Sequence, residues 1–396
     1  MKPKLFRIST VPLSLNILLK GQLHYLNNYF DVTGISGKGS DLDQVEKREG
    51  VRIHAISMQR PISVFKDLQA LFRLYRYFRK ERPQIIHSIT PKAGLLSMAA
   101  GKMAGVPVRI HTFTGLVFPY RIGMMQWLLM NMDRLLCYCA THIYPEGEGV
   151  KKDLQQYGIT NKPLRVLGNG NVNGVDVDYF SPLQIREEER LALREKLAIA
   201  PNDFVFLYVG RLVRDKGVNE LVQAFKSLKS SDLDSVDKEY SSVKLLLVGP
   251  YEHDLDPLQS ETLREIEQNP AIISVGYQEF VRPFFAISQC LVFPSYREGF
   301  PNVVLQAGAM ELPSVVTDIS GSNEIIQQGK NGLVIPVKEV NALQQAMEYC
   351  LQNPQIIQEM KAWARTWVVE HYDQEKLWTL IKNEYIKFLN TRGKTS

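Results

Sequence analysis

Two groups of polar residues follow apolar stretches in the C-terminal half of the chain, and the first has the chemistry of an anion site. The stretch Leu207–Gly217 runs from an apolar strand into a turn that carries Arg211 and Lys216, just before an expected helix from Val218. Two cations beside the unpaired N–H groups at a helix start can hold a diphosphate. The pattern therefore predicts a phosphate-binding turn.

The second group follows the apolar run Cys290–Pro294 and has the chemistry of a site for sugar hydroxyls. Pro301 suits the first turn of a helix, where its missing N–H costs nothing. The first N–H groups of that helix have no partners within it and are expected to face a ligand at the end of the strand. Glu298 lies at the rim of this site, where a carboxylate can accept hydrogen bonds from hydroxyl groups. Gln306 lies one helical turn beyond Asn302, on the same face.

Strands that alternate with helices are expected to position these residues in both halves of the chain. This spacing predicts parallel sheets covered on both faces, with ligands bound beyond the carboxyl ends of the strands. In the first half, strands are expected at 4–9, 31–36, 51–56, 84–88, 106–112, 142–144 and 164–167, and helices at 15–29, 64–79, 93–104 and 150–157. In the second half, strands are expected at 204–209, 243–248, 272–275, 290–294, 314–317 and 333–335, and helices at 218–228, 262–267, 324–328, 342–352, 354–370 and 372–389. The Gly- and Asn-rich stretch Gly168–Gly174 predicts a hinge between two domains, and 230–242 predicts a polar surface loop.

The composition is that of a globular protein without a membrane-spanning segment. The 396 residues suffice for two domains, and 45% are hydrophobic while 22% are charged. The N-terminus enters a strand without an apolar signal core, which indicates a cytoplasmic protein. The four cysteines lack metal-ligand spacing, and no metal is expected. Acid pairs at Asp41/Asp43, Asp176/Asp178, Asp232/Asp234 and Asp254/Asp256 are interpreted as solvated turns rather than as metal ligands.

The charge is unevenly distributed, and this favours an anionic partner for the first half. Residues 1–170 carry 24 Lys and Arg against 11 Asp and Glu, whereas residues 171–396 carry 23 against 31. No basic-aromatic motif of a nucleic-acid reader is present, so an anionic membrane surface or a lipid diphosphate is the expected partner. The Met-rich segment Ile122–Met130 predicts either a helix in the bilayer interface or a core helix. The helix at 66–79 is expected to bury Leu68, Leu71, Phe72, Tyr75 and Phe78 and to expose its arginines.

Several of these motifs resemble those of the retaining glycosyltransferases of family 4, which have the GT-B fold. Gly210, Arg211, Lys216 and Gly217 match the family's Gly-Arg-x4-Lys-Gly stretch, and Glu298 matches the first residue of its paired-glutamate motif. Gln306 occupies the second position, where relatives have glutamate. The segments His87–Gly94 and His111–Leu116 resemble the family's acceptor domain. Thr114 stands where many relatives have a sugar-contacting histidine, with His111 three residues earlier, and either residue can take up that contact.

The resemblance implies an α/β protein of two Rossmann-like, doubly wound domains that face each other across a cleft. Residues 1–172, with a returning helix at about 372–396, would bind the acceptor, and residues 173–371 would bind a nucleotide sugar, expected to be UDP-linked. The implied reaction moves a hexose or N-acetylhexosamine to a lipid-diphosphate-linked or other saccharide acceptor in bacterial surface polysaccharide synthesis. It needs no metal or cofactor and takes place at the inner face of the plasma membrane. The catalytic residues implied are Glu298, Arg211, Lys216, His111 and Thr114, and the donor-binding residues are Gly210, Arg211, Lys216, Tyr277, Glu298, Gly299, Phe300, Pro301, Asn302 and Gln306.

Two other functions fit the same motifs. A UDP-sugar epimerase shares the two-lobed fold but needs general acid and base groups, for which the sequence offers only Glu298. A non-catalytic nucleotide-sugar-binding protein would account for the departures at Gln306 and Thr114.

Overall fold

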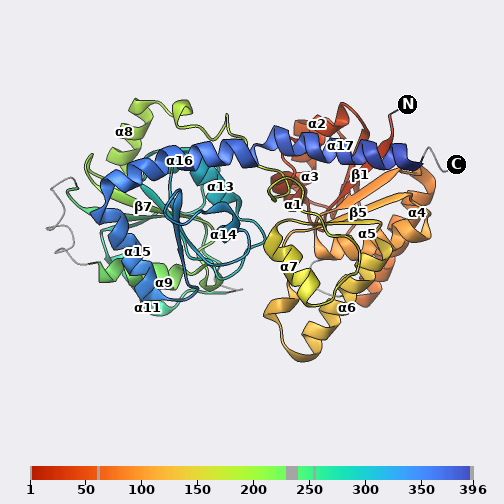
Figure 1. The fold of residues 1–396 in the computed structure, drawn as a ribbon, viewed down its shortest axis with the longest axis horizontal. Coiled ribbons are helices and arrows are strands. Elements are labelled where there is room, and N and C mark those ends of the chain that lie inside the picture. Colours follow the sequence, from red (N-terminus) through yellow and green to blue (C-terminus); the bar gives the residue numbers. More distant parts are fainter. Residues whose placement is uncertain (1, 60–62, 229–239, 253–255, 393–396) are drawn as a thin grey trace. The chain divides into compact units, whose positions relative to one another are not determined.

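The structure is a computed structural model that describes residues 2–59, 63–228, 240–252 and 256–392 (Figure 1). The chain forms two compact units, one of Met1–Gly174 with Gln374–Ser396 and one of Val175–Asp373. Most of the predicted surface loop at 230–242 lies outside the described residues, as do Asp232, Asp234 and Asp254.

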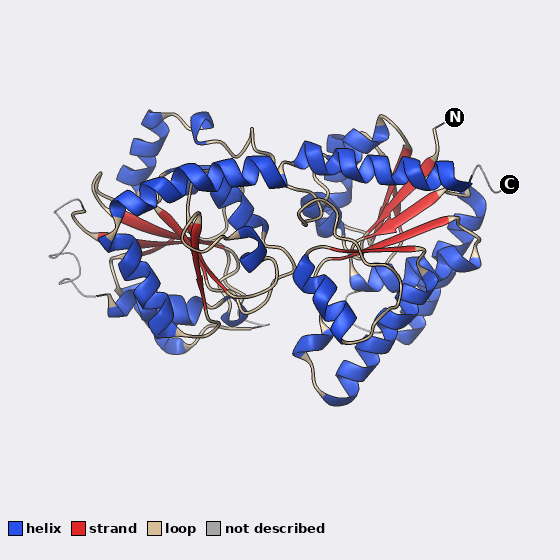
Figure 2. Cartoon of the chain, viewed as in Figure 1, coloured by secondary structure: helices blue, strands red, loops and turns tan. Residues whose placement is uncertain are grey.

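The first unit, here called unit 1, is built on a six-stranded parallel sheet of order β3-β2-β1-β4-β5-β6. Helices cover both faces of this sheet (Figure 2). Its central strand β1 is buried on both faces, as is usual in a parallel sheet; Leu5, Phe6, Arg7 and Ile8 have no exposed surface. The strands are β1 (Lys4–Ile8), β2 (Asp31–Ser36), β3 (Arg52–Ala55), β4 (Ile85–Ser88), β5 (Val108–Phe113) and β6 (His142–Pro145). The helices are α1 (Pro12–Leu18), α2 (Gln22–Asn27), α3 (Ser40–Glu49), α4 (Val64–Glu81), α5 (Pro91–Met103), α6 (Gly123–Cys139), α7 (Glu148–Gln156) and α17 (Gln374–Arg392).

The second unit, unit 2, repeats this topology with a parallel sheet of order β12-β11-β10-β7-β8-β9. Its strands are β7 (Phe204–Val209), β8 (Val243–Val248), β9 (Ile272–Ser274), β10 (Cys290–Phe293), β11 (Ser314–Thr317) and β12 (Gly332–Ile335). Its helices are α8 (Glu187–Lys196), α9 (Val218–Ser227), α11 (Ser260–Gln268), α12 (Arg282–Ala286), α13 (Asn302–Ala309), α14 (Ser322–Ile325), α15 (Val340–Gln352) and α16 (Pro354–Tyr372). Both sheets have the doubly wound strand order of Rossmann-like proteins.

The predicted α/β class with two parallel sheets is confirmed, and several local predictions are wrong. The expected strand at 164–167 reduces to a single bridge between Leu164 and Ile143. Helices α3, α8 and α12 were not predicted, and Asp41 and Asp43 lie in the first turn of α3 rather than in a solvated turn. Acidic residues are favoured there because they complement the helix dipole.

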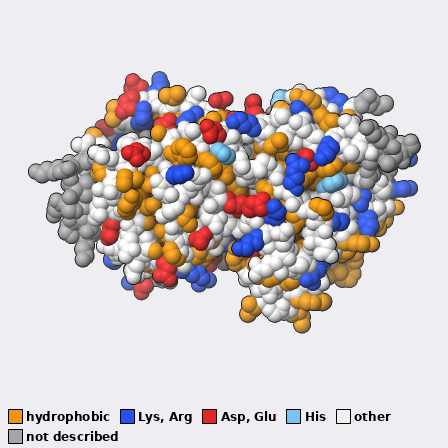
Figure 3. Space-filling view, in the orientation of Figure 1, with side chains coloured by type: hydrophobic (Ala, Val, Ile, Leu, Met, Phe, Trp, Pro, Cys, Tyr) orange, Lys and Arg blue, Asp and Glu red, His pale blue; other side chains and the backbone are white. Residues whose placement is uncertain are grey.

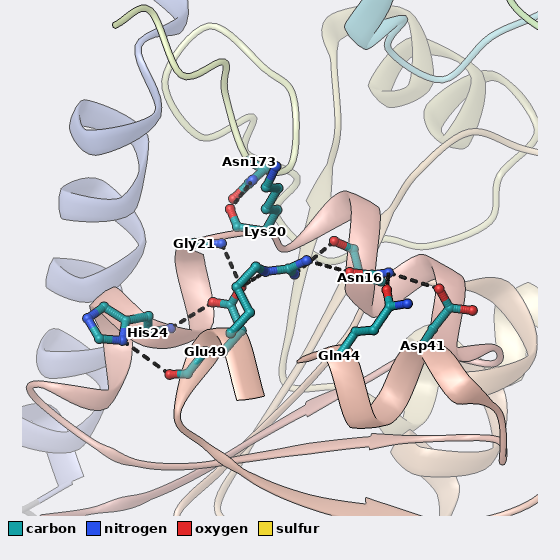
Figure 4. A network of polar contacts seen from close by, with 9 residues as sticks. Asn16, Lys20, Gly21, His24, Asp41, Gln44, Glu49 and Asn173 are labelled. Atoms are coloured by element: carbon teal, nitrogen blue, oxygen red, sulfur yellow. Dashed lines mark hydrogen bonds and ion pairs between the residues drawn. The ribbon is translucent and has the colours of Figure 1, made fainter. Parts of the chain in front are cut away.

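The single helix predicted for residues 15–29 is in fact two helices, and the cause is a carboxylate from a distant helix. Gly21 has a left-handed backbone (φ 79°) between α1 and α2. The buried Glu49 of α3 accepts hydrogen bonds from the N–H groups of Gly21 (2.9 Å) and His24 (3.0 Å) (Figure 4). It thereby satisfies the first donors of α2, so the chain can start a new helix at this point.

The segment that leads out of unit 1 is anchored next to this break through Asn173 (Figure 4). The Asn173 side chain donates to the carbonyl of Lys20 (2.9 Å) and accepts from Gln22 (3.0 Å) and from the indole N–H of Trp378 in α17 (2.7 Å). The end of the Gly- and Asn-rich stretch is therefore held by both α2 and α17, at the boundary where unit 2 begins.

Helices α4 and α6 expose large apolar side chains, and the predicted core face of α4 is partly wrong. Leu68 and Phe72 are 57% and 58% exposed, and the buried residues of α4 are instead Ala70, Leu74 and Phe78. Helical periodicity places both sets on one side but cannot separate a face turned to the core from a neighbouring face turned outward. Figure 3 shows hydrophobic side chains gathered at the end of unit 1 that carries α6, with Lys and Arg side chains beside them. In the described part of the chain, no helix has the length and apolar character needed to cross a membrane.

Candidate functional site

The predicted phosphate-binding turn and the Glu298 turn follow neighbouring strands of unit 2. Strand β7 lies between β10 and β8, so the chain leaves β7 in one direction and returns on its other side. Ligands of open α/β sheets bind beyond the strand ends at such a switch point. The turn after β7 carries Arg211 and Lys216, and the turn after β10 carries Glu298.

Lys216 and Glu298 are in direct contact. The Lys216 ammonium donates a hydrogen bond to Glu298 Oε1 in an ion pair, and the two side chains are only 15% and 17% exposed. The ammonium also lies 5.9 Å from the centroid of the Phe293 ring. The structure therefore brings together a cation and a carboxylate that are 82 residues apart in the sequence.

Asp215, which was not singled out in the sequence, ties the same two turns together. Its carbonyl accepts from the N–H of Tyr296 (2.9 Å), and its carboxylate pairs with Arg297 (3.2 Å). Asp256 in turn accepts from the Asp215 N–H (2.6 Å) and pairs with Arg214 (3.2 Å), so the interpretation of Asp256 as part of a solvated turn is wrong. These contacts fix where Lys216 and Glu298 point.

Arg211 lies on the same turn but has a different partner. Its guanidinium pairs with Glu252 (2.7 Å), which follows β8, and is about half exposed. The buried Tyr208 hydroxyl donates to the Arg211 carbonyl (2.8 Å). Burial raises the Tyr208 pKa well above its ordinary value, the carboxylates of Glu298 and Asp215 raise it further, and Arg211 opposes them. Arg211 thus acts on the same buried tyrosine as Glu298 and Asp215. Its own side chain is about half exposed and is paired with Glu252.

The predicted donor-binding residues around α13 differ in what they can offer a ligand. Phe300 is 7% exposed and packs 5.7 Å from the Tyr372 ring, so only its backbone can contact a ligand. Pro301 is the buried N-cap residue of α13, and Asn302 and Gln306 are half-buried on that helix. The remaining positions are Gly210 and Gly299, which lie in the two turns, and Tyr277, which follows β9 and is 72% exposed.

His111 and Thr114 belong to unit 1, whereas Lys216 and Glu298 belong to unit 2. His111 has no exposed surface; its Nδ1 hydrogen-bonds with the Ser88 hydroxyl (2.8 Å) and burial lowers its pKa to about 3. A side chain on Gly94 would lie 2.5 Å from the imidazole, so the glycine of the Lys92–Gly94 segment makes room for His111. Thr114 is half-buried and donates to the Ile89 carbonyl (2.8 Å). Of the two alternatives for the sugar contact, Thr114 is the one with an exposed surface.

The buried histidines of unit 1 predict a loss of stability at acidic pH. Burial lowers the pKa of His87 well below its ordinary value and that of His111 to about 3, so both are neutral in the folded protein. In the unfolded chain they take up protons below about pH 6.5, so stability is present above that pH and is lost as the pH falls toward 3. At pH 5.5 the two together should cost about 2.5 kcal/mol relative to neutral pH.

This loss can be measured by urea unfolding of wild type and His111→Asn at pH 7.5 and 5.5. The variant should lose about half of the histidine contribution. Burial also raises the pKa of Asp133 to about 7, which stabilises the fold as the pH falls, but this effect is common to both proteins and cancels in the difference. Equal pH dependence in the two proteins would show that His111 is not buried as a neutral imidazole.

Unit 1 has a cavity of its own, with a volume of about 370 Å³. It lies at the carboxyl ends of β1 and β4, which form the switch point of this sheet, and one wall is α6. Asp133 of α6 lines it and was missed in the sequence because a single acid within an apolar helix gives no signal by itself. Within the described ranges, no three His, Cys, Asp or Glu side chains come together as a potential metal site.

Comparison with known proteins gives matches along most of the chain. Residues 189–367 match the family model described as "Glycosyl transferases group 1", and residues 29–170 match a "Glycosyl transferase 4-like domain". The chain is similar to the capsular polysaccharide biosynthesis glycosyltransferase CapM of Staphylococcus aureus, with 31% identity over 98% of this chain and 97% of that protein. It is 26% identical, over 91% of this chain and 90% of the relative, to the UDP-Gal:alpha-D-GlcNAc-diphosphoundecaprenol alpha-1,3-galactosyltransferase of Escherichia coli.

Solved structures show the same fold. The crystal structure of Anabaena Alr3699/HepE in complex with UDP superposes with a TM-score of 0.80, covering 98% of this chain and all of that one, at 16% identity. At this identity the likeness concerns the arrangement of helices and strands alone.

Proposed function

The chain belongs to the group 1 glycosyl transferases (glycosyltransferase family 4, with the GT-B fold), and on that premise we propose that it is a retaining enzyme that moves a hexose or N-acetylhexosamine from a UDP-sugar to a lipid-diphosphate-linked sugar. A role in capsular or other surface polysaccharide synthesis agrees with the name of its Staphylococcus aureus relative. The observation that carries the proposal is the Lys216–Glu298 pair at the switch point of unit 2.

Unit 2 would bind the donor, and the charges around β7 and β10 would do the chemical work. Lys216 and Arg211 would neutralise the diphosphate as the bond to the sugar breaks, which is worth roughly 3–4 kcal/mol of barrier for a preorganised contact. Glu298 would hold sugar hydroxyls. Lys216 is paired with Glu298, so the site holds opposite charges where phosphate and hydroxyl groups would bind. The UDP named in the Anabaena complex supports this choice of nucleotide.

Unit 1 would bind the acceptor, with Thr114 rather than the buried His111 reaching the donor sugar. The excess of Lys and Arg in residues 1–170 suits a diphosphate-linked acceptor. The Escherichia coli relative is named for such an acceptor, a sugar linked to diphosphoundecaprenol.

The test is to incubate the purified chain with a panel of UDP-sugars, first by thermal shift and then with GlcNAc-diphospho-prenol. A donor present at 100 times its dissociation constant should stabilise the protein by about 2.7 kcal/mol. The product should retain the anomeric configuration of the donor, as determined by NMR. If turnover occurs with UDP-sugar alone, an epimerase explains the site; binding without transfer to any acceptor indicates a sensor.

Gln306 would hold the ribose diol of the nucleotide, since it lies on α13, the helix that follows the Glu298 turn. An amide can accept with its oxygen and donate with its nitrogen, whereas a carboxylate accepts from both hydroxyls. We therefore expect Gln306→Glu to retain activity and Gln306→Ala to weaken UDP binding about tenfold, the value of one hydrogen bond of 1–1.5 kcal/mol. Titration calorimetry with UDP measures this change, and an unchanged affinity in Gln306→Ala would remove the residue from the site.

Helices α4 and α6 would bind unit 1 to the surface of the membrane that contains the acceptor lipid. On α4, exposed Val64, Phe65, Leu68 and Phe72 adjoin exposed arginines, and α6 presents Met124 and Trp127, which are 84% and 64% exposed. Helix α5 packs against both. Apolar residues flanked by cations bind anionic bilayers.

This membrane proposal predicts sedimentation with phosphatidylglycerol vesicles. The double variant Phe65→Ser/Trp127→Ser should lose most of the bound fraction, because each exposed aromatic side chain contributes apolar area to the contact. A variant at the exposed Leu183 of unit 2 serves as the matched control. Equal sedimentation of all three proteins would contradict this role of α4 and α6.

A further inference from the structure

The cavity of unit 1 is largely apolar. Its lining from the strand ends and helices includes Val11, Leu95, Phe113, Leu116, Leu129 and Met132. Its volume of about 370 Å³ lies at the lower end of the range of small-molecule sites. Such a wall gives few hydrogen bonds, so it favours the apolar groups of a ligand over its hydroxyl groups.

Two charged side chains line this cavity, and they differ in their partners. Lys92 is 9% exposed and is bound to both carboxylate oxygens of Asp67 (2.8 and 2.9 Å). Asp133, in contrast, is half-buried and receives no hydrogen bond and no ion pair from any described residue. The Asp133 carboxylate can therefore accept a hydrogen bond from a ligand in the cavity.

The position of Asp133 on α6 indicates which chemical groups the ligand carries. Leu129 precedes it by four residues, so both project from the same helical face into the cavity. A ligand group that combines an N–H donor with a methyl group a few ångströms away fits this pair. The acetamido group of an N-acetyl sugar has that composition.

We propose that the cavity beneath α6 binds the acceptor sugar through an acetamido group, whose N–H donates to Asp133 while its methyl group packs against Leu129 and Met132. This inference rests on the proposed function, because it takes unit 1 as the acceptor side. It makes Asp133 a specificity-determining residue for N-acetylated acceptors.

The experiment measures acceptor binding without any donor, so that it does not depend on transfer. Water-soluble, short-chain prenyl diphosphates carrying either GlcNAc or glucose are titrated into the full chain by calorimetry. Wild type should bind the GlcNAc ligand at least 100-fold more tightly than the glucose ligand. Asp133→Leu should lose that preference by weakening GlcNAc binding about 100-fold, with a change below threefold for glucose. Asp153→Asn, an acid on α7 outside the cavity, should behave as wild type.

Several results would overturn the inference. The first is an equal loss of affinity for both ligands in Asp133→Leu, and the second is an unchanged affinity for both. The third is an affinity that depends on the length of the prenyl chain rather than on the sugar substituent, which would assign the cavity to the lipid. If Asp133→Leu does not fold, the cavity-filling Leu129→Phe gives the same comparison. UDP affinity, measured in parallel, separates the two proposals: its absence in wild type would refute the proposed function, whereas a retained UDP site with no GlcNAc preference refutes only the role of Asp133.

Discussion

Replacing Lys216 by alanine is expected to lower kcat by about 100- to 1000-fold, with a smaller effect on KM for the donor. A preorganised charge aimed at the developing negative charge of a leaving group is worth about 2.7–4 kcal/mol, and it acts most strongly in the transition state. The Lys216 side chain is 15% exposed and is held by Glu298 and by turns that Asp215 cross-links, so its position is fixed before the ligand arrives. Initial rates over a range of UDP-sugar concentrations separate the two effects.

Two further variants make this result interpretable. Lys216→Arg keeps the charge and should retain a measurable fraction of the activity, because a guanidinium can replace an ammonium as a phosphate ligand. Lys226 is a control in the same unit, since it pairs with Glu265 on the surface and is 65% exposed. Lys226→Ala should be fully active. If Lys216→Ala had the same kcat as wild type, the site would lie elsewhere.

The sheets could be predicted from the sequence because their strands are buried on both faces. Runs such as Phe204–Val209 and Cys290–Phe293 are apolar throughout, and their spacing by helices leaves few alternative topologies. The break at Gly21 could not be predicted, because its cause is Glu49, whose carboxylate reaches it from a helix 28 residues further along the chain. The exposure of Phe72 was also missed, since helical spacing does not indicate which apolar stripe lacks a covering layer.

The candidate site was partly predictable for a similar reason. Lys216 and Glu298 each follow a strand, and neighbouring parallel strands bring their ends together, so their contact follows from topology. The burial of His111 depends instead on the absence of a side chain at Gly94 and on the Ser88 hydroxyl, neither of which has a recognisable spacing. Asp133 could not be identified from the sequence, because it is a candidate only as part of the cavity lining. A cavity depends on how distant segments pack.

Gly217→Ala is expected to lower the free energy of unfolding of unit 2 by about 2–5 kcal/mol and to abolish donor binding. Gly217 joins the turn after β7 to α9 with a left-handed backbone (φ 72°), which costs an alanine about 1–2 kcal/mol. The added methyl group would also lie 2.0 Å from the Pro294 carbonyl oxygen, and forcing such a contact costs about 1–3 kcal/mol. The turns after β7 and β10 must then separate, which pulls Lys216 away from Glu298.

Gly329→Ala separates the two causes of that loss. Gly329 has nearly the same backbone (φ 76°) in the same unit, but no atom lies within 4 Å of the position that its Cβ would take. It should therefore show only the backbone cost of about 1–2 kcal/mol and keep its UDP affinity. Urea unfolding and UDP titration of both variants provide the comparison. Because Gly217 and Pro294 bring the two charged turns close to each other, equal behaviour of the two variants would mean that the turns are not in contact and that Lys216 and Glu298 act apart.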